Sequence, residues 1–583
     1  MPARPMRRKD DRAKSLEACR VNSVYARIFS MPKVSAHDAA LGVLAATLIV
    51  VVLFWRLGTP TFWDPDEAHY AETTREMIAS SDWNAPYYNE QPFFDKPVLF
   101  HVLQGTAMRL VSDPEFGARL VPALAALGLI AITVWFGTVM VSGDVGIVAG
   151  LMLAACPAVF GLARYAILDT LFTMFMFGGA ASLAVAALRD RPGLQWLGYV
   201  ALALGVLTKG PIALVLCGLT MLILIGCSAD LRRRLLGLHW ALGLGIVLAA
   251  ASPWFVYMYL RFGQAFVNGY ALDENLRLFA SSRFANQPGF GFYFQILAAA
   301  MLPWTGLLVG RLVDDVRAAT RGERIDEVET MLWAWTLAVV GFFTLSTFKL
   351  DHYVFPAAPA LCVLCARAWS DVRADRDAIR NRASRVGLLL TGPFLVAAGL
   401  GCGYLLMTRL DLPWGAMTVP IALTLAGAGV TVRVNLRRAR PPRVPWLVLA
   451  ALTVTYAGLI LYALPALEQR KVVPDMAQWV AARAQPTDRI ASFRLNRWNP
   501  AYRFYVGRHL TFLEDAAEAD AFFRASQPFF CIMRESAYDE FVAQGAPIKI
   551  VYAREGMWAT SGRALWRTGT PLARFVVVSG ARE

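Results

Sequence analysis

The feature that most constrains this chain is a succession of apolar segments, each about 20 residues long. Hydrophobic residues make up 57% of the 583 residues and charged residues 17%, whereas about 25% are charged in an ordinary soluble domain. The sequence therefore predicts a mainly α-helical, polytopic membrane protein with about 13 transmembrane helices. The predicted spans are 39–57, 117–140, 144–163, 168–188, 194–208, 210–228, 236–259, 292–310, 331–347, 352–370, 386–407, 416–434 and 445–464.

Basic residues gather in short segments between the apolar runs. Residues 1–38 hold nine Lys and Arg and are predicted to form a cytoplasmic basic tail. With the N-terminus inside, the arginine clusters at 232–234, 311–324, 373–385 and 433–443 fall on the cytoplasmic side, as the positive-inside rule expects. This pattern accounts for the net charge of +14 without a nucleic-acid partner.

The character of the chain changes after the last apolar segment. Segment 39–466 is predicted to be the transmembrane domain, and 467–583 is predicted to be a small α/β domain. Strand-like runs at 490–493, 529–533, 548–552 and 575–578 alternate with helix-like runs at 474–484 and 514–525. An odd number of spans places this domain outside the cytoplasm, in the periplasm of a bacterial cell.

The first predicted outer loop, 58–116, combines acidic residues with one lysine, Lys96. Asp66 and Glu67 lie near its start. Its helix-like runs, 67–80 and 96–111, are predicted to lie along the membrane interface. Carboxylates and a cation beside a lipid surface suggest chemistry on an anionic, lipid-borne substrate. The alternative is that these charges only cap a loop.

Three lysines, Lys96, Lys209 and Lys349, fall at predicted outer ends of spans. The positive-inside rule places lysines on the cytoplasmic side, so it does not explain these three. A charge near hydrocarbon is costly, so we expect these lysines to bind an anion such as a lipid phosphate or pyrophosphate. The alternative is that each extends towards lipid headgroups.

Acidic and aromatic residues recur on the same predicted side. Asp169 lies between two apolar spans, and Asp351, His352 and Tyr353 follow a later span. Alternating topology returns these segments to one membrane face. A cavity there would offer carboxylates, including Asp66 and Glu67, for protons or a metal ion. No metal-ligand spacing is recognisable; a divalent cation is left open, and no cofactor is predicted.

Five short motifs together resemble the ArnT-like 4-amino-4-deoxy-L-arabinose transferases. These are C-type membrane glycosyltransferases that use polyprenyl-phosphate sugars and are related to protein O-mannosyltransferases. The resemblance runs from about residue 40 to 370. The motifs are DEAHYAE at 66–72, FDKP at 94–97, AILD at 166–169, TKG at 208–210 and KLDHYVFP at 349–356.

The resemblance implies roles for individual residues. Asp66 matches a loop carboxylate that these enzymes require for transfer, and Asp169 matches a second acidic position. Lys96 matches the cation that holds the lipid phosphate. Tyr70 and Tyr353 match tyrosines of the same cavity.

Other candidates extend this set. Glu67 joins the catalytic carboxylates, Lys349 joins the phosphate-binding residues, and His352 is expected to line the cavity. The chain also departs from the family. Phe93-Phe94-Asp95 stands where tyrosine, phenylalanine and glutamate are usual. Arg277, a further phosphate-binding candidate, is one place off the expected pattern. These departures affect the identity of the sugar and of the acceptor more than they affect the class of reaction.

The predicted function is inverting transfer of a sugar, with 4-amino-4-deoxy-L-arabinose as the candidate, from undecaprenyl phosphate. The acceptor would be lipid A or another envelope molecule. The enzyme would act as a monomer among the lipids of the bacterial inner membrane, with its active site facing the periplasm.

Three alternatives stay open from the sequence. One is transfer to a hydroxyl acceptor, as in protein O-mannosyltransferases. The second is a lipid or sugar transporter, although the chain lacks the internal repeats that transporters usually show. The third is a non-catalytic polysaccharide-assembly or lipid-binding subunit.

Overall fold

The computed structural model describes residues 36–281, 288–374, 377, 379–408, 413–436, 444–495, 500–558 and 572–580. The basic tail predicted at 1–38 lies almost wholly outside the described residues. The chain divides into two compact units, Met1–Ile49 and Val50–Glu583. In the first unit the described part is the beginning of helix α2 (Ala36–Phe54).

Apolar helices dominate the second unit, and the prediction of a mainly helical, polytopic membrane protein is confirmed. Among the described residues, eight helices are long and apolar enough to cross a membrane, or up to ten if each of two bent pairs is one span. The eight are Pro114–Met140, Asp169–Leu188, Trp240–Phe262, Glu327–Leu345, Asp351–Arg373, Arg382–Thr408, Trp414–Val434 and Val444–Glu468. Three shorter apolar helices, Ala40–Phe54, Leu194–Lys209 and Ile212–Cys227, coincide with further predicted spans. The number of 13 spans stays a prediction.

The helical part of the second unit runs in the following order. Its elements are α3 (Asp66–Ser80), α4 (Leu99–Leu110), α5 (Pro114–Met140), α6 (Gly143–Ala155), α7 (Pro157–Ala163), α8 (Asp169–Leu188), α9 (Leu194–Lys209), α10 (Ile212–Cys227), α11 (Ala229–Leu236), α12 (Trp240–Phe262), α13 (Gln264–Phe266), the π-helix η1 (Val267–Arg277), α14 (Leu278–Ala280), α15 (Phe292–Ala300), α16 (Thr305–Thr320), α17 (Glu327–Leu345), the 3₁₀ helix η2 (Asp351–Ala357), α18 (Ala358–Arg373), α19 (Arg382–Thr408), η3 (Trp414–Met417), α20 (Thr418–Leu436), α21 (Val444–Gly458), η4 (Leu459–Ala463) and α22 (Leu464–Glu468).

Two predicted spans are broken in the structure. The segment 144–163 forms α6 and α7, which are bent by 64°, and 292–310 forms α15 and the start of α16, bent by 120°. A proline lies at each break, Pro157 and Pro303. Proline disfavours the helical conformation in the residue before it and has no N–H to donate, so neither helix continues straight.

The first predicted outer loop has the two expected helices. α3 and α4 correspond to the predicted runs 67–80 and 96–111. Between them is a short antiparallel hairpin of β1 (Tyr87–Tyr88) and β2 (Gln91–Pro92). The position of these helices along a membrane interface stays a prediction.

The C-terminal region contains a mixed five-stranded sheet with the strand order β4-β3-β5-β7-β6. The four predicted strands are present, together with α23 and α25 where helices were predicted. The sequence did not predict the three-residue strand β4 or the short helices α24 and α26. The bounds are α23 (Val473–Ala481), β3 (Arg489–Phe493), α24 (Pro500–Val506), β4 (Thr511–Leu513), α25 (Ala516–Arg524), β5 (Phe529–Arg534), α26 (Glu535–Ala543), β6 (Ile548–Gly556) and β7 (Ala573–Gly580).

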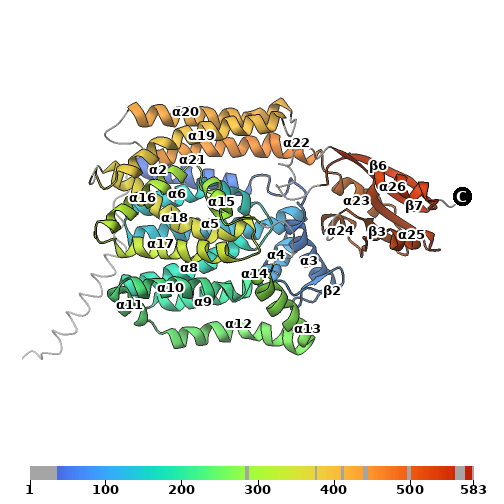
Figure 1. Ribbon diagram of the computed structural model, residues 1–583, viewed down its shortest axis with the longest axis horizontal. Helices are drawn as coiled ribbons and strands as arrows, with labels where there is room; N and C mark the ends of the chain where they lie inside the picture. Colours follow the sequence, from blue (N-terminus) through green and yellow to red (C-terminus); the bar gives the residue numbers. More distant parts are fainter. Residues whose placement is uncertain are drawn as a thin grey trace, which may run out of the picture. The chain divides into compact units, whose positions relative to one another are not determined.

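The sheet region packs against the first loop. Figure 1 shows the sheet, in brown to red, at one end of the helices of the second unit, on the side of α3 and α4. Phe62 and Ala68 of the loop share a hydrophobic cluster with Tyr502 and Val577. The loop is therefore held between the helices and the sheet region. The boundary of a separate domain at residue 467, and its place in the periplasm, stay predictions.

Candidate active site

A cavity of about 160 Å³ lies where several distant segments meet at one end of the helices. We call it the Asp66 cavity. It is formed by the start of α3, the turn before α4, the start of α8, the end of α9, η1 and the segment leading into η2. Its lining residues are Asp66, His69, Tyr70, Phe93, Asp95, Lys96, Ile167, Asp169, Lys209, Glu274, Phe348, Leu350, His352 and Tyr353.

The cavity collects six of the nine residues singled out from the sequence. They are Asp66, Tyr70, Lys96, Asp169, His352 and Tyr353. The three others, Glu67, Lys349 and Arg277, are not among its lining residues. The structure thus brings two of the three predicted catalytic carboxylates, Lys96 and the predicted rings of Tyr70, His352 and Tyr353 into one place, and the roles of these residues stay predictions.

Asp66 is half-buried in the first turn of α3. Its carboxylate has no hydrogen bond or ion pair with another described residue. Burial raises its pKa, His352 opposes this, and the carboxylates of Asp351 and Asp169 raise the pKa further. A carboxylate with a raised pKa and no partner is a stronger base than an ordinary aspartate.

Asp169, by contrast, is held by two groups. Its Oδ1 accepts a short hydrogen bond from Lys209 Nζ, and its Oδ2 lies 3.6 Å from His352 Nε2. Lys209 Nζ also lies 4.7 Å from the centroid of the Tyr353 ring, within cation–π distance. Asp169 is therefore suited to fixing the positions of Lys209 and His352.

Lys96 is the cation of the cavity with the loosest carboxylate partner. Its Nζ lies 3.7 Å from Glu274 Oε2, beyond hydrogen-bond distance. It donates one hydrogen bond, of 2.9 Å, to the backbone carbonyl of Asp95. An ammonium group has three donors, so Lys96 retains capacity for an incoming anion.

Glu67 lies in a buried network instead of the cavity. Its carboxylate accepts from Arg119 Nε at 2.6 Å and from Arg119 Nη2 at 2.9 Å. It also accepts from the backbone N–H groups of Trp63, at 3.0 Å, and Ala166, at 2.9 Å. Both side chains of the ion pair are almost fully buried.

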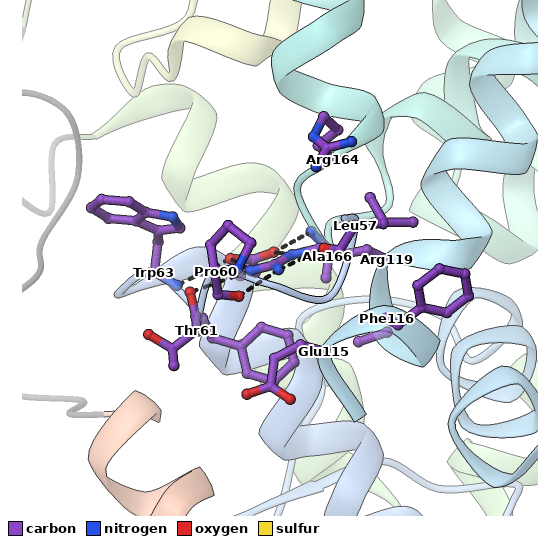
Figure 2. A network of polar contacts seen from close by, with 12 residues as sticks. Leu57, Pro60, Thr61, Trp63, Glu115, Phe116, Arg119, Arg164 and Ala166 are labelled. Atoms are coloured by element: carbon purple, nitrogen blue, oxygen red, sulfur yellow. Dashed lines mark hydrogen bonds and ion pairs between the residues drawn. The ribbon is translucent and has the colours of Figure 1, made fainter. Parts of the chain in front are cut away.

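Arg119 extends this network to the loop before α3. Its guanidinium donates to the carbonyl oxygens of Leu57, Pro60 and Thr61 at 3.0, 2.6 and 3.3 Å. Figure 2 shows Arg119 pointing into this turn, with Ala166 close by. The pair thus joins α5, the start of α3 and the segment before α8. Asp66 and Asp169 lie within three residues of these contacts in the sequence.

Lys349 and Arg277 also lie apart from the cavity. Lys349 is buried and donates a short hydrogen bond to the Ser346 carbonyl, which closes the turn after α17. Arg277 is at the end of η1 with its side chain 68% exposed, and it pairs with Asp273 one turn earlier. In this conformation neither residue reaches the Asp66 cavity.

Several lining residues were not among the predicted site residues. Lys209 was expected from the sequence to bind an anion, because it is a lysine on the unexpected side of a span; it lines the cavity and pairs with Asp169, and its anion binding stays a prediction. Glu274 was missed because its position depends on η1, an 11-residue π-helix, and π-helices have no reliable sequence signature. His69 and Asp95 adjoin predicted residues in sequence and were assigned no role.

The ionisable lining is predominantly acidic. Four carboxylates, Asp66, Asp95, Asp169 and Glu274, face two lysines. Among the described residues, no group of three or more His, Cys, Asp or Glu side chains is arranged to hold a metal ion. The divalent cation left open by the sequence stays a prediction.

Comparisons with known proteins identify proteins that this chain resembles. Residues 43–265 match the family model described as dolichyl-phosphate-mannose-protein mannosyltransferase. An undecaprenyl phosphate-α-4-amino-4-deoxy-L-arabinose arabinosyl transferase of Aeromonas salmonicida is 30% identical over 340 residues, which is 57% of this chain and 60% of that protein. A protein of the same name from Sodalis glossinidius is 28% identical over 400 residues, 67% of this chain and 65% of its own length.

The crystal structure of ArnT from Cupriavidus metallidurans bound to undecaprenyl phosphate superimposes with a TM-score of 0.71 at 22% identity, covering 92% of this chain and 97% of that one. The chain has the ArnT-like fold. The resemblance predicted from the motifs is therefore confirmed in sequence and in fold. The chain spans less than two thirds of the length of the two curated relatives described above, so what the ArnT-like fold does in this chain is a matter for proposal.

Proposed function

We propose that the protein is an inverting glycosyltransferase that moves a sugar from undecaprenyl phosphate to lipid A or another envelope acceptor. The candidate sugar is 4-amino-4-deoxy-L-arabinose. The reaction takes place at the periplasmic face of the bacterial inner membrane, and the enzyme acts as a monomer. The observation that supports this best is the Asp66 cavity, which gathers a loosely paired lysine and an unpaired carboxylate at the ends of apolar helices.

The first chemical requirement is stabilisation of the leaving group. The bond between the anomeric carbon and the phosphate oxygen breaks, and its electron pair leaves on the phosphate. Lys96 exchanges its 3.7 Å contact with Glu274 for charge-assisted hydrogen bonds to that phosphate. Preorganised donors of this kind are worth about 10²–10³ in kcat.

The second requirement concerns the attacking oxygen. It approaches the anomeric carbon opposite the phosphate, which inverts that centre. A hydroxyl acceptor passes its proton to Asp66, whose raised pKa suits a general base; such bases contribute about 10²–10⁴ in rate. An ionised phosphate acceptor has no proton to lose, and Asp66 then orients the reacting groups.

The test is transfer of radiolabelled sugar from polyprenyl phosphate by the purified protein. Lys96→Ala is expected to lower kcat by about 10²–10³. Lys549→Ala, which removes an exposed lysine from β6, is the matched control and is expected to retain full activity. Transfer by Lys96→Ala at the rate of the control would contradict the proposal.

The acceptor class is separated by Asp66→Asn. With a hydroxyl acceptor this variant is expected to lose about 10²–10⁴ in rate, and with a phosphate acceptor much less. Transfer to a protein hydroxyl is the second candidate function, because the matched family model is that of protein mannosyltransferases. Mass spectrometry of lipid A and of surface proteins from a deletion strain identifies which acceptor loses its sugar.

The transporter and the non-catalytic subunit fit the molecule less well. The curated relatives are named as transferases. Turnover of the labelled donor in detergent, where no second compartment exists, distinguishes an enzyme from both.

A further inference from the structure

A second and larger cavity has a volume of about 440 Å³. Some of its lining residues are close in sequence to those of the Asp66 cavity, but the two cavities share none. We call it the Arg164 cavity. It is formed by the turn after α2, the residue after α7, the end of the last candidate span, α23 and β6. Its lining residues are Arg56, Thr59, Pro60, Thr61, Arg164, Ile460, Leu464, Pro465, Glu468, Gln469, Lys471, Pro474, Asp475, Gln478 and Arg554.

The charge of this cavity is opposite to that of the Asp66 cavity. Four cations face two carboxylates, Glu468 and Asp475, which leaves a surplus of two positive charges. Glu468 pairs with Lys471 at 3.0 Å, and Asp475 pairs with Arg554. Among the described residues no carboxylate pairs with the remaining two cations, Arg56 and Arg164.

Arg164 is half-buried, and its hydrogen bonds go to backbone oxygens. It donates to the carbonyls of Val52 and Leu53 through Nη1 and of Arg56 through Nη2. Three of its five donors are thus used, and no anion balances its charge. Burial lowers the pKa of Arg164 to about 10, with the charge of Arg119 as a second cause. A bound anion would relieve both effects.

The cavity also has an apolar side. Ile460 and Leu464 line it, and both belong to the candidate membrane span Val444–Glu468, near its end. Cations beside the end of a membrane span fit a lipid whose headgroup is anionic and whose chains continue into the bilayer. A fully water-soluble anion would gain no binding energy from the apolar side of the cavity.

The buried pair of Glu67 and Arg119 separates the two cavities. Pro60 and Thr61 line the Arg164 cavity, and Asp66, a few residues later, lines the other. Between them Glu67 accepts the backbone N–H of Ala166. A group bound at Arg164 would therefore contact the same loop that carries Asp66, in a cavity whose lining shares no residue with the Asp66 cavity.

We infer that the Arg164 cavity binds the phosphate of an anionic lipid headgroup, distinct from the phosphate of the sugar donor, through Arg56 and Arg164. Two sources share this chemistry: an ordinary acidic phospholipid, and a phosphate of the acceptor lipid that does not react. Binding here anchors a lipid next to the loop of Asp66.

The test measures lipid retained by the purified full-length protein, by native mass spectrometry after exposure to mixed micelles of phosphatidylglycerol and phosphatidylcholine. The wild type is expected to retain phosphatidylglycerol in preference. Arg56→Gln and Arg164→Gln are each expected to lower this retention about tenfold, the value of one charge-assisted hydrogen bond. Arg524→Gln removes an exposed arginine of α25 and is the charge-matched control, expected to behave as the wild type.

Two results with the arginine variants would overturn the inference. One is unchanged retention in both Arg56→Gln and Arg164→Gln. The other is an equal loss in Arg524→Gln, which would indicate a response to overall charge. Arg56 is exposed and donates only to Thr59 within the described residues, so its variant is informative even if Arg164→Gln fails to fold. Displacement of phosphatidylglycerol by an equal concentration of lipid A identifies the acceptor as the preferred source. Displacement by an equal concentration of inorganic phosphate would show that the lipid chains add no affinity, and it would also overturn the inference. Retention is measured without turnover, so it does not depend on the proposed sugar transfer.

Discussion

Replacing Glu67 with glutamine separates a structural role from a catalytic one. The sequence places Glu67 beside Asp66 among the catalytic carboxylates, whereas the structure shows it bound to Arg119 away from the cavity. Glutamine keeps the shape of the side chain and removes its charge. The change therefore tests the ion pair with little disturbance of packing.

The magnitude follows from the contacts. Glu67→Gln replaces one carboxylate oxygen with an NH2 group, so one donor of Arg119 and one backbone N–H lose their acceptor. The guanidinium of Arg119 is left buried without a counter-charge. Breaking a buried pair by removing one partner costs about 3–5 kcal/mol. Arg119 keeps three bonds to backbone carbonyls, which solvate it in part, so we expect the lower end, about 3 kcal/mol.

The assay is thermal unfolding of the purified protein in detergent, combined with sugar transfer well below the unfolding temperature. Glu67→Gln is expected to lower the Tm by several degrees while kcat stays within about tenfold of the wild type, since the side chain does not touch the reacting groups. The double variant Glu67→Gln with Arg119→Met removes the stranded charge as well and is expected to recover part of the loss. Arg119→Met alone leaves the Glu67 carboxylate buried and is expected to be destabilised.

The opposite pattern would refute the structural role. If Glu67→Gln unfolded at the wild-type temperature and lost transfer by more than about 10², Glu67 would be a catalytic carboxylate. If the acceptor is a hydroxyl, Asp66→Asn serves as the reference for such a loss. Its carboxylate has no partner among the described residues, so its Tm is expected to change little.

Two further predictions concern the contact between the sheet region and the first loop. Burial raises the pKa of Asp64 from 3.8 to about 7. Between these two values the folded state holds a proton that the unfolded state releases. The free energy of unfolding should therefore fall by about 4 kcal/mol as pH rises from 4 to above 7. Asp64→Asn should flatten a plot of Tm against pH, and an unchanged slope would exclude Asp64 as its source. Arg503 Nε lies 2.9 Å from Glu72 Oε1, and Arg503 Nη2 lies 2.7 Å from Glu76 Oε1. Arg503→Met should therefore lower the free energy of unfolding by about 3–5 kcal/mol and increase amide hydrogen exchange across 500–506. Unchanged exchange there would show that these ion pairs do not hold α24 against α3.

Much of the fold could be predicted because the bilayer imposes a strong pattern. A span must be apolar over about 20 residues, and Lys and Arg are in excess in cytoplasmic loops. Local breaks are harder to predict, as 144–163 and 292–310 show. Both are almost entirely apolar. Hydropathy therefore cannot distinguish a straight helix from one bent at a proline, since proline is tolerated in other helices. In α5, for example, Pro122 lies inside a continuous helix.

The candidate site could be predicted in part for a related reason. Asp66, Asp169 and Lys96 are charged residues at the ends of apolar segments, where a charge is costly and calls for an explanation. Sequence order alone could not show which charges pair with each other. Glu67 and Lys349 look equivalent to Asp66 and Lys96 until tertiary contacts assign them to a buried ion pair and to a turn.

The acidic balance of the Asp66 cavity leads to a last prediction. The donor brings a phosphate into a site with four carboxylates and two lysines, so binding opposes existing negative charge. Because burial raises the pKa of Asp66, its protonation is the nearest way to reduce that charge. Donor affinity should therefore fall as pH rises through this pKa.

Measurement of donor binding between pH 5 and 8.5 tests this directly. Asp66→Asn mimics the protonated carboxyl and should bind the donor more tightly than the wild type at high pH, with a shallower dependence on pH. Any remaining dependence would come from the other ionisable lining residues, among them His352 and Glu274. Equal slopes in the variant and the wild type would show that Asp66 is already ionised when the donor binds. The negative charge would then have to be offset by Lys96 leaving Glu274, and Glu274→Gln would be the variant that strengthens donor binding.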